Sequence, residues 1–309
     1  MSWELSKSGL ARLVALGFIW GSVFMFIKIA GYAVSPVQMV FTRLVLGALV
    51  LLPFVFSRGL RLPKEAKVWG HLAVAALLGN AIPWTLFAWG EQSGTSSIAG
   101  VINSTTPLWT IVAAFVLGQD RGLGVTKIAG VLLGLLGTLL IAAPWNAASV
   151  GSTGSVVAFV VGTVSLGASF AYMGKFLTGR GVPPLVLAAA QLTAASVLML
   201  LALPFAGLQP VSFRLDSALS LVVLGAVCTG LAYVLNFQII AKDGPTIAST
   251  VTYLFPVVSV LLGALVLDEV IGWPVYVGAV ASILGVTLVR RKPKQAPGGV
   301  TAPVAAAKG

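Results

Sequence analysis

Apolar residues fill ten long stretches of the chain, and short polar or charged breaks separate them. The stretches run roughly over residues 10–30, 36–56, 69–90, 95–117, 124–143, 153–177, 183–203, 216–240, 246–267 and 272–289. Each has roughly the 17–25 residues with which a helix crosses a hydrocarbon core of about 30 Å. We therefore predict an all-α polytopic membrane protein with ten transmembrane helices.

The composition agrees with this prediction. Hydrophobic residues make up 58% of the chain and charged residues 9%, whereas about a quarter of the residues of a soluble protein are charged. The first apolar stretch follows Lys7 and Arg12 as in a signal peptide, but its length and the nine stretches after it favour a retained helix. The single cysteine, Cys228, lies inside an apolar stretch, so no disulfide framework is expected.

The chain contains an internal duplication. The segment from Gly94 to Ala142 has a counterpart that starts at Gly244, with Pro107 aligned to Pro256 and Asp120 aligned to Glu269. Glycines of the apolar stretches that follow also align. We therefore expect two five-helix repeats, residues 1–146 and 147–292, followed by a disordered tail over 293–309.

The basic residues predict the orientation in the membrane. Of the 19 lysines and arginines, 16 lie at breaks that fall on one side of the membrane if the chain crosses it ten times. Cytoplasmic loops are rich in these residues, so both termini are expected in the cytoplasm. The net charge of +11 is thereby explained without a nucleic-acid partner.

An odd number of helices in each repeat means that the second repeat enters the membrane from the opposite side. Asp120 is then cytoplasmic and Glu269 faces outward. Inverted repeats of this kind are typical of secondary transporters, whose substrate site lies at the midplane between the halves.

The run WGSVFMFIK over 20–28, the run SPVQMVFTR over 35–43 and the repeated proline–acid–glycine pattern resemble the EamA-type branch of the drug/metabolite transporter superfamily. The resemblance extends over about residues 1–292. Within the branch, the many tryptophans and the chain length are similar to those of the bacterial aromatic amino-acid exporters. The resemblance implies a transporter in the cell inner membrane, with the fifth and tenth helices outside the cavity.

Polar and aromatic residues that share one helix face predict which side chains line such a cavity, because polar groups that face lipid stay unsatisfied. The expected substrate-binding residues are Trp20, Phe24, Asn80, Trp84, Asn103, Trp109, Ser169, Tyr172, Gln191, Tyr233, Asn236 and Tyr253. The aromatic members could equally serve packing or sit at the membrane interface.

A second group of residues is expected to gate or shape the path. Pro107 and Pro256 interrupt helices and predict hinges or exposed carbonyls, or else tolerated kinks. Arg43 lies inside a span, where it either binds a substrate carboxylate or ties helices together. Asp120 and Glu269, in the breaks, are expected to cap helix ends or act as gates. No acid lies near the middle of a span, and Glu91 at a span end is the nearest candidate for proton coupling.

The fifth and tenth stretches carry small residues four apart, at Gly130 and Gly134 and at Gly278 and Ser282. This spacing lets helices approach closely, so these helices form either a scaffold or the surface of a homodimer. No nucleotide-binding loop, metal cluster or catalytic triad is apparent in the sequence, and neither a cofactor nor an enzymatic activity is expected.

The sequence thus favours a secondary transporter that exports small metabolites by alternating access, with aromatic or large neutral amino acids as the preferred cargo. Two alternatives remain open at this stage. One keeps the fold and carries another metabolite or drug, and the other is a membrane scaffold or lipid-interacting protein without a solute path.

Overall fold

A computed structural model describes residues 7–93, 99, 102–119, 124–142, 152–206, 208–255, 257–258 and 273–290. All regular structure within these residues is helical. Five helical spans are long and apolar enough to cross a membrane: Pro36–Ser57, Ala66–Gly90, Thr153–Phe176, Pro184–Phe205 and Leu215–Asp243. Shorter apolar helices accompany them, so the chain is an integral membrane protein, as predicted.

The first half of the chain contains the following helices. They are α1 (Lys7–Gly21), α2 (Val23–Ala30), α3 (Pro36–Ser57), α4 (Ala66–Ala76), η1 (Leu77–Ala81), α5 (Ile82–Gly90), α7 (Thr106–Val116) and α8 (Val125–Ala142). Helix α3 begins with a capping box in which Ser35 and Gln38 bond each other's backbone N–H groups, and Pro36 follows directly. Such a start fixes where the helix begins.

The second half repeats this order. Its helices are α9 (Thr153–Phe176), α10 (Pro184–Ala206), α11 (Leu215–Gly225), η3 (Ala226–Leu231), α12 (Ala232–Asp243), α13 (Pro245–Ser249), η4 (Thr250–Tyr253) and α15 (Trp273–Arg290). Gly244 separates α12 from α13 with a φ of 91°, a backbone conformation that favours glycine.

The same irregularity occurs in both halves. Segments η1 and η3 are π-helical and interrupt two long spans, starting at Leu77 and Ala226. Their separation along the chain equals that of Pro107 and Pro256. A π-helical turn leaves backbone groups outside the usual α-helical bonding pattern and is frequent at functional sites.

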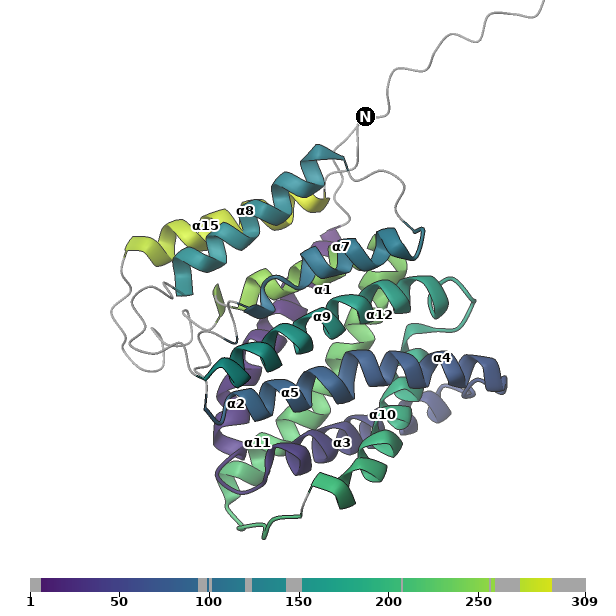
Figure 1. Ribbon diagram of the computed structural model, residues 1–309. Helices are drawn as coiled ribbons and strands as arrows, with labels where there is room; N and C mark the ends of the chain where they lie inside the picture. The colour runs from purple at the N-terminus through teal and green to yellow at the C-terminus, as the bar shows by residue number, and fades with distance from the viewer. Residues whose placement is uncertain are drawn as a thin grey trace, which may run out of the picture.

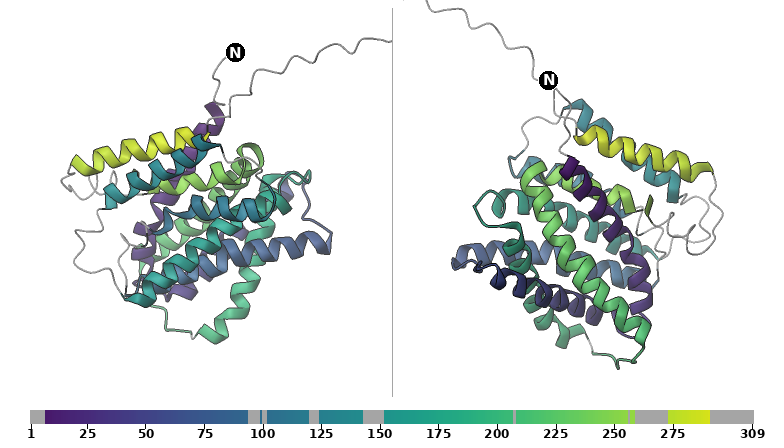
Figure 2. Two further views of the ribbon diagram at one scale, coloured as in Figure 1. Left: turned by 45° about the horizontal axis from the view of Figure 1, so that its top comes forward. Right: turned by 180° about the vertical axis from the view of Figure 1, so that it is seen from behind.

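The helices form one bundle with one pair at its edge (Figure 1). Helices α8 and α15 lie side by side at the edge of the bundle, in contact with η4, and keep this arrangement in both views of Figure 2. At one end of the bundle Ser212 N–H donates to Ala33 O. At the other end Gln119 Nε2 donates to Ala171 O, so each end joins the two halves of the sequence.

Where the chain is described, the predicted apolar stretches are largely helical, and the structure differs from the prediction in their interior. Pro107 was expected within a continuous helix, but the chain turns at Ser104 and Thr105 and α7 begins at Thr106. The proline therefore lies in the first turn of a helix, where its missing N–H costs nothing. In the second half η4 forms at the equivalent place. Asp120, Pro256 and Glu269 lie outside the described residues.

Candidate functional site

Six buried side chains meet where the two halves of the chain pack together. Arg43 comes from α3 and Gln191 from α10, Asn80 from η1 and Thr229 from η3, and Trp84 from α5 and Tyr233 from α12. We call these six residues the central cluster. Each is at most 7% exposed.

The central cluster consists of three pairs of equivalent positions. Arg43 and Gln191 follow the first residues of their helices, Pro36 and Pro184, at the same distance along the chain. Asn80 and Thr229 are equivalent in the two π-helical segments, and Trp84 and Tyr233 lie at the same distance from the first residues of those segments. At each of these three positions, both repeats therefore carry a polar or aromatic side chain.

The hydrogen bonds between these residues cross from one half to the other. The Nε of Arg43 donates to Oγ1 of Thr229 over 2.9 Å. In the equivalent bond, Nε2 of Gln191 donates to Oδ1 of Asn80 over 2.8 Å. The cluster therefore has an approximate two-fold symmetry, in which residue types differ but the connections recur.

Aromatic rings complete the cluster. The guanidinium of Arg43 lies over the ring of Trp84, 4.6 Å from its centroid, which is cation–π geometry. Asn80 Nδ2 donates to the hydroxyl of Tyr233 over 2.7 Å, and that hydroxyl donates to the carbonyl of Gly79 over 2.9 Å. A side chain of the second half thus satisfies a carbonyl of the π-helical segment of the first half.

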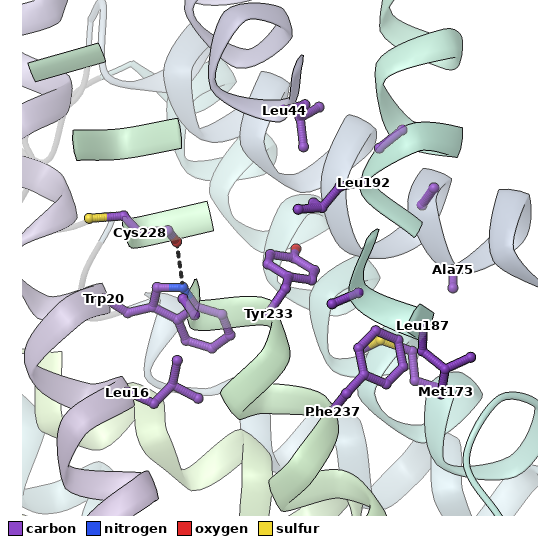
Figure 3. Close-up of a cluster of buried hydrophobic side chains, with 14 of the residues drawn as sticks. Leu16, Trp20, Leu44, Ala75, Met173, Leu187, Leu192, Cys228, Tyr233 and Phe237 are labelled. Carbon is purple, nitrogen blue, oxygen red and sulfur yellow. Dashed lines mark hydrogen bonds between the residues drawn. The ribbon is translucent and has the colours of Figure 1, made fainter. Parts of the chain in front are cut away.

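The converse holds for the second π-helical segment. Trp20 Nε1, from α1, donates to the carbonyl of Cys228 in η3 over 3.0 Å. The ring of Trp20 also meets the ring of Tyr233 edge to face, with centroids 6.1 Å apart. Figure 3 shows Trp20 and Tyr233 approaching each other from different helices, with the bond to Cys228 as a dashed line.

Several polar atoms of this region are buried without a hydrogen-bond partner in the part of the chain that the structure describes. They include Nη2 of Arg43, Oε1 of Gln191 and Oδ1 of Asn236. Asn236, 1% exposed, follows Tyr233 on α12. A buried polar atom without a partner costs about 1–3 kcal/mol, so these atoms are suited to bind a ligand that supplies the missing partners.

Other predicted site residues lie elsewhere. Asn103 accepts from Thr106 one turn along the chain. The hydroxyl of Tyr253 donates to the carbonyl of Val131 in α8 over 2.8 Å, so Tyr253 connects α8 to the bundle. Of Phe24 only the backbone in α2 is described.

Ser169 lies beside the central cluster. Its hydroxyl donates to Leu166 O of its own helix. A Cβ placed on Gly79 would lie 2.9 Å from that hydroxyl oxygen, so Ser169 closely covers the first π-helical segment.

Trp109 lines an apolar hollow of about 360 Å³ between α7, α8 and α9, together with Leu135, Leu139 and Val160. Its side chain is 37% exposed, and its indole N–H donates to the hydroxyl of Thr105. This hollow is separate from the central cluster. The central chamber expected from the sequence stays a prediction, because the central cluster is closed to solvent.

Tyr172 belongs to a second aromatic group near one end of the bundle. Its hydroxyl lies 2.7 Å from Nδ1 of His71, and the ring of Phe176 stacks on His71 with centroids 4.9 Å apart. These contacts tie α4 to α9 across the two halves. Near the opposite end, just after α5, burial raises the pKa of Glu91 to about 7.

Sequence patterns found most of the central cluster but missed the π-helical segments. Apart from Asn80 and Thr229, the residues of both segments are apolar or small, and nothing in their composition distinguishes them from an α-helix. A signal existed in the duplication itself, because comparing equivalent positions pairs Asn80 with Thr229 and Arg43 with Gln191.

Helices α8 and α15 pack through their small residues. A Cβ on Gly137 would lie 2.5 Å from the carbonyl oxygen of Gly278, and one on Gly285 would lie 2.5 Å from the backbone nitrogen of Gly134. The small faces therefore serve a contact within the chain, as a scaffold requires. A homodimer stays a prediction and would have to use other faces of these helices.

The fold and the central cluster define a polytopic helical membrane protein with two equivalent halves and a buried polar site between them. Comparison with protein families identifies its kind: residues 7–143 and, a second time, residues 153–291 match the EamA-like transporter family. The chain belongs to this family. The assignment confirms the superfamily and the transporter class expected from the sequence.

Individual relatives agree with this assignment. An uncharacterized transporter of Archaeoglobus fulgidus is 26% identical over 281 residues, which cover 90% of this chain and 95% of the relative. The uncharacterized inner membrane transporter YedA of Escherichia coli is 27% identical over 256 residues, 81% of this chain and 80% of YedA. A protein crystal structure with 20% identity superposes with a TM-score of 0.76 over 92% of this chain and 98% of that one, which shows the shared fold.

Proposed function

We propose that this transporter exports small amphipathic metabolites, with aromatic or large neutral amino acids as its cargo. The observation that carries the proposal is the central cluster. It places a guanidinium, buried amide oxygens and aromatic rings together, between two equivalent halves and within the membrane-spanning helices. An aromatic amino acid has complementary groups: a carboxylate, an ammonium and an apolar ring.

The proposed mechanism is alternating access, in which the two halves tilt against each other around the central cluster. The bonds between the halves at this site run from side chain to side chain or from side chain to backbone carbonyl. Such bonds can be exchanged for bonds to a solute without unfolding a helix. As part of this proposal, the repeats are inverted, both termini are cytoplasmic and the protein lies in the cell inner membrane.

Export can be measured in proteoliposomes loaded with labelled phenylalanine or tryptophan. We expect efflux that saturates with the internal concentration and exceeds that of liposomes without protein. Equal efflux from both preparations would rule out this cargo. The orientation can be tested separately with single cysteines in the breaks: labelling of positions 120 and 269 from the same side would contradict the inverted arrangement.

A different cargo on the same fold is the second candidate, and a scaffold without a solute path is the third. A thermal-shift panel of amino acids, nucleotide sugars and cationic drugs separates them. Saturable stabilisation by one solute class identifies the cargo, because a ligand that binds the native state raises its stability by mass action. A scaffold predicts that no member of the panel raises the melting temperature.

A further inference from the structure

Arg43 carries a positive charge in the interior of the bundle. It is the eighth residue of α3, a helix long enough to span the membrane, and its side chain is 1% exposed. An arginine at the centre of a membrane helix costs at least about 2.5–3.5 kcal/mol on insertion scales. The charge therefore requires compensation.

The described surroundings compensate it only in part. Thr229 accepts one hydrogen bond from Nε, and the ring of Trp84 lies under the guanidinium. Among the described residues, no carboxylate forms an ion pair with Arg43. Its Nη2 has no hydrogen-bond partner in the part of the chain that the structure describes. An anionic group in contact with Nη2 would compensate the rest of the charge.

A carboxylate is complementary to the guanidinium of Arg43. A guanidinium presents its N–H groups in a fixed planar fork that matches the two oxygens of a carboxylate. Gln191 on α10 and Asn236, one turn after Tyr233 on α12, each have a buried acceptor oxygen without a partner among the described residues, and acceptors of this kind suit an ammonium. A phosphate group would bring about two negative charges to one guanidinium, which leaves an excess of negative charge.

We propose that Arg43 binds the carboxylate of the transported solute and that Thr229 and Trp84 position its guanidinium. The inference rests on the proposed transport function and assigns the two ends of the cargo. The carboxylate lies at Arg43, and an ammonium, where the solute has one, lies toward the amide oxygens of Gln191 and Asn236. The cargo class is then a monocarboxylate or zwitterion with an apolar side chain.

The competing role for Arg43 is a structural tie between α3 and η3. Glycines bring these helices close together, since a Cβ on Gly230 would lie 3.4 Å from the carbonyl oxygen of Gly47. A tie affects stability, but it has no preference for one functional group of a solute over another. The selectivity among solutes therefore separates the two roles.

The test measures how analogues compete with efflux or exchange of labelled phenylalanine in proteoliposomes. Phenylalaninamide lacks the carboxylate, and N-acetylphenylalanine keeps it but lacks the ammonium. We expect the wild type to bind phenylalaninamide at least about tenfold more weakly than phenylalanine, while N-acetylphenylalanine still competes. Equal competition by phenylalanine and phenylalaninamide would overturn the assignment of Arg43.

Variants then show which residue is responsible for the preference for the carboxylate. Arg43→Gln should bind phenylalanine and its amide equally weakly, and Arg43→Lys should keep part of the preference because it keeps the charge. Thr229→Val should raise the KM for phenylalanine several-fold. Thr193→Val is the matched control, since its hydroxyl bonds only the carbonyl of Ala189 in its own helix. A preference for the carboxylate that persists unchanged in Arg43→Gln would contradict the proposal.

The failure of this assignment can be distinguished from the failure of the proposed function in two cases. If Arg43→Gln does not fold, the preference of the wild type and the effect of Thr229→Val still decide the assignment. If the wild type transports no amino acid, the proposed cargo fails, and a thermal-shift comparison of phenylacetate with phenethylamine tests Arg43 alone. Stabilisation by phenylacetate supports the carboxylate site, whereas stabilisation by phenethylamine alone, or by neither compound, overturns it.

Discussion

Two of the contacts that join the halves of this transporter differ in the groups that form them. In the pair α8 and α15, glycines bring the two backbones together without room for a Cβ. In the central cluster, polar and aromatic side chains bridge the halves through hydrogen bonds. Both contacts pair equivalent elements of the duplication.

The difference indicates what each contact can do. Closely packed backbones have one favourable arrangement, and any sliding opens a gap or a clash. Hydrogen bonds between side chains can break and re-form with other partners at little net cost. We therefore interpret the contact between α8 and α15 as one that stays fixed during transport. The contacts of the central cluster are those that can exchange their hydrogen-bond partners.

The largest expected effect concerns the contact between α8 and α15. Gly137→Ala places a methyl group 2.5 Å from the Gly278 carbonyl oxygen, and overpacking of this kind costs about 1–3 kcal/mol. Gly70→Ala is the matched control, because nothing lies within 4 Å of its new Cβ. Thermal unfolding in detergent, followed by tryptophan fluorescence, should show a lower melting temperature for Gly137→Ala only. Equal melting temperatures would remove the distinction between the two contacts.

An intermediate effect is expected at Asn80, which joins two members of the central cluster. Asn80→Leu removes the bonds to Gln191 and Tyr233 and leaves a buried amide with fewer partners, at a cost of about 1–3 kcal/mol. We expect the transport rate to fall by more than the loss of folded protein explains, since the same residues are proposed to bind the solute. The control is Thr85→Val on the same span, whose hydroxyl donates a long hydrogen bond to the sulfur of Met199 at 4.0 Å. Unchanged transport by Asn80→Leu would show that the cluster is a passive contact.

The smallest expected effect distinguishes two tyrosines. Tyr253→Phe loses the bond to Val131 of α8 and should cost about 1 kcal/mol of stability while KM stays the same. Tyr233→Phe loses the bond to Gly79 in the central cluster and should cost a similar amount of stability but also change KM. Melting curves and transport kinetics of the two variants provide the comparison. A changed KM in Tyr253→Phe alone would reverse the assignment of these residues.

Helix positions could be predicted from the sequence because the length of an apolar run is fixed by the membrane itself. The residues of the central cluster could be recognised in part, since Asn80, Trp84, Gln191 and Tyr233 are polar or aromatic side chains in apolar surroundings. Tyr253 has the same signature but bonds α8. Composition and helical spacing do not say which neighbouring helix a side chain meets.

The irregular backbone could not be predicted for a related reason. A π-helical turn in η1 or η3 is stabilised by distant side chains, and Trp20 is more than two hundred residues away from Cys228 in the sequence. Similarly, the turn at Ser104 and Thr105 moves Pro107 from the middle of a helix to its start. Both features depend on tertiary contacts more than on local propensity.

Each π-helical segment has a carbonyl that is hydrogen-bonded by a side chain of the other half, and this has a consequence for how the protein is made. The carbonyl of Gly79 depends on Tyr233, and the carbonyl of Cys228 depends on Trp20. A first half that has left the ribosome alone would hold an unsatisfied carbonyl in the lipid, where such groups are costly. Assembly of this chain is therefore completed only when the second half has been inserted, and two separately expressed halves should be stable together but not singly.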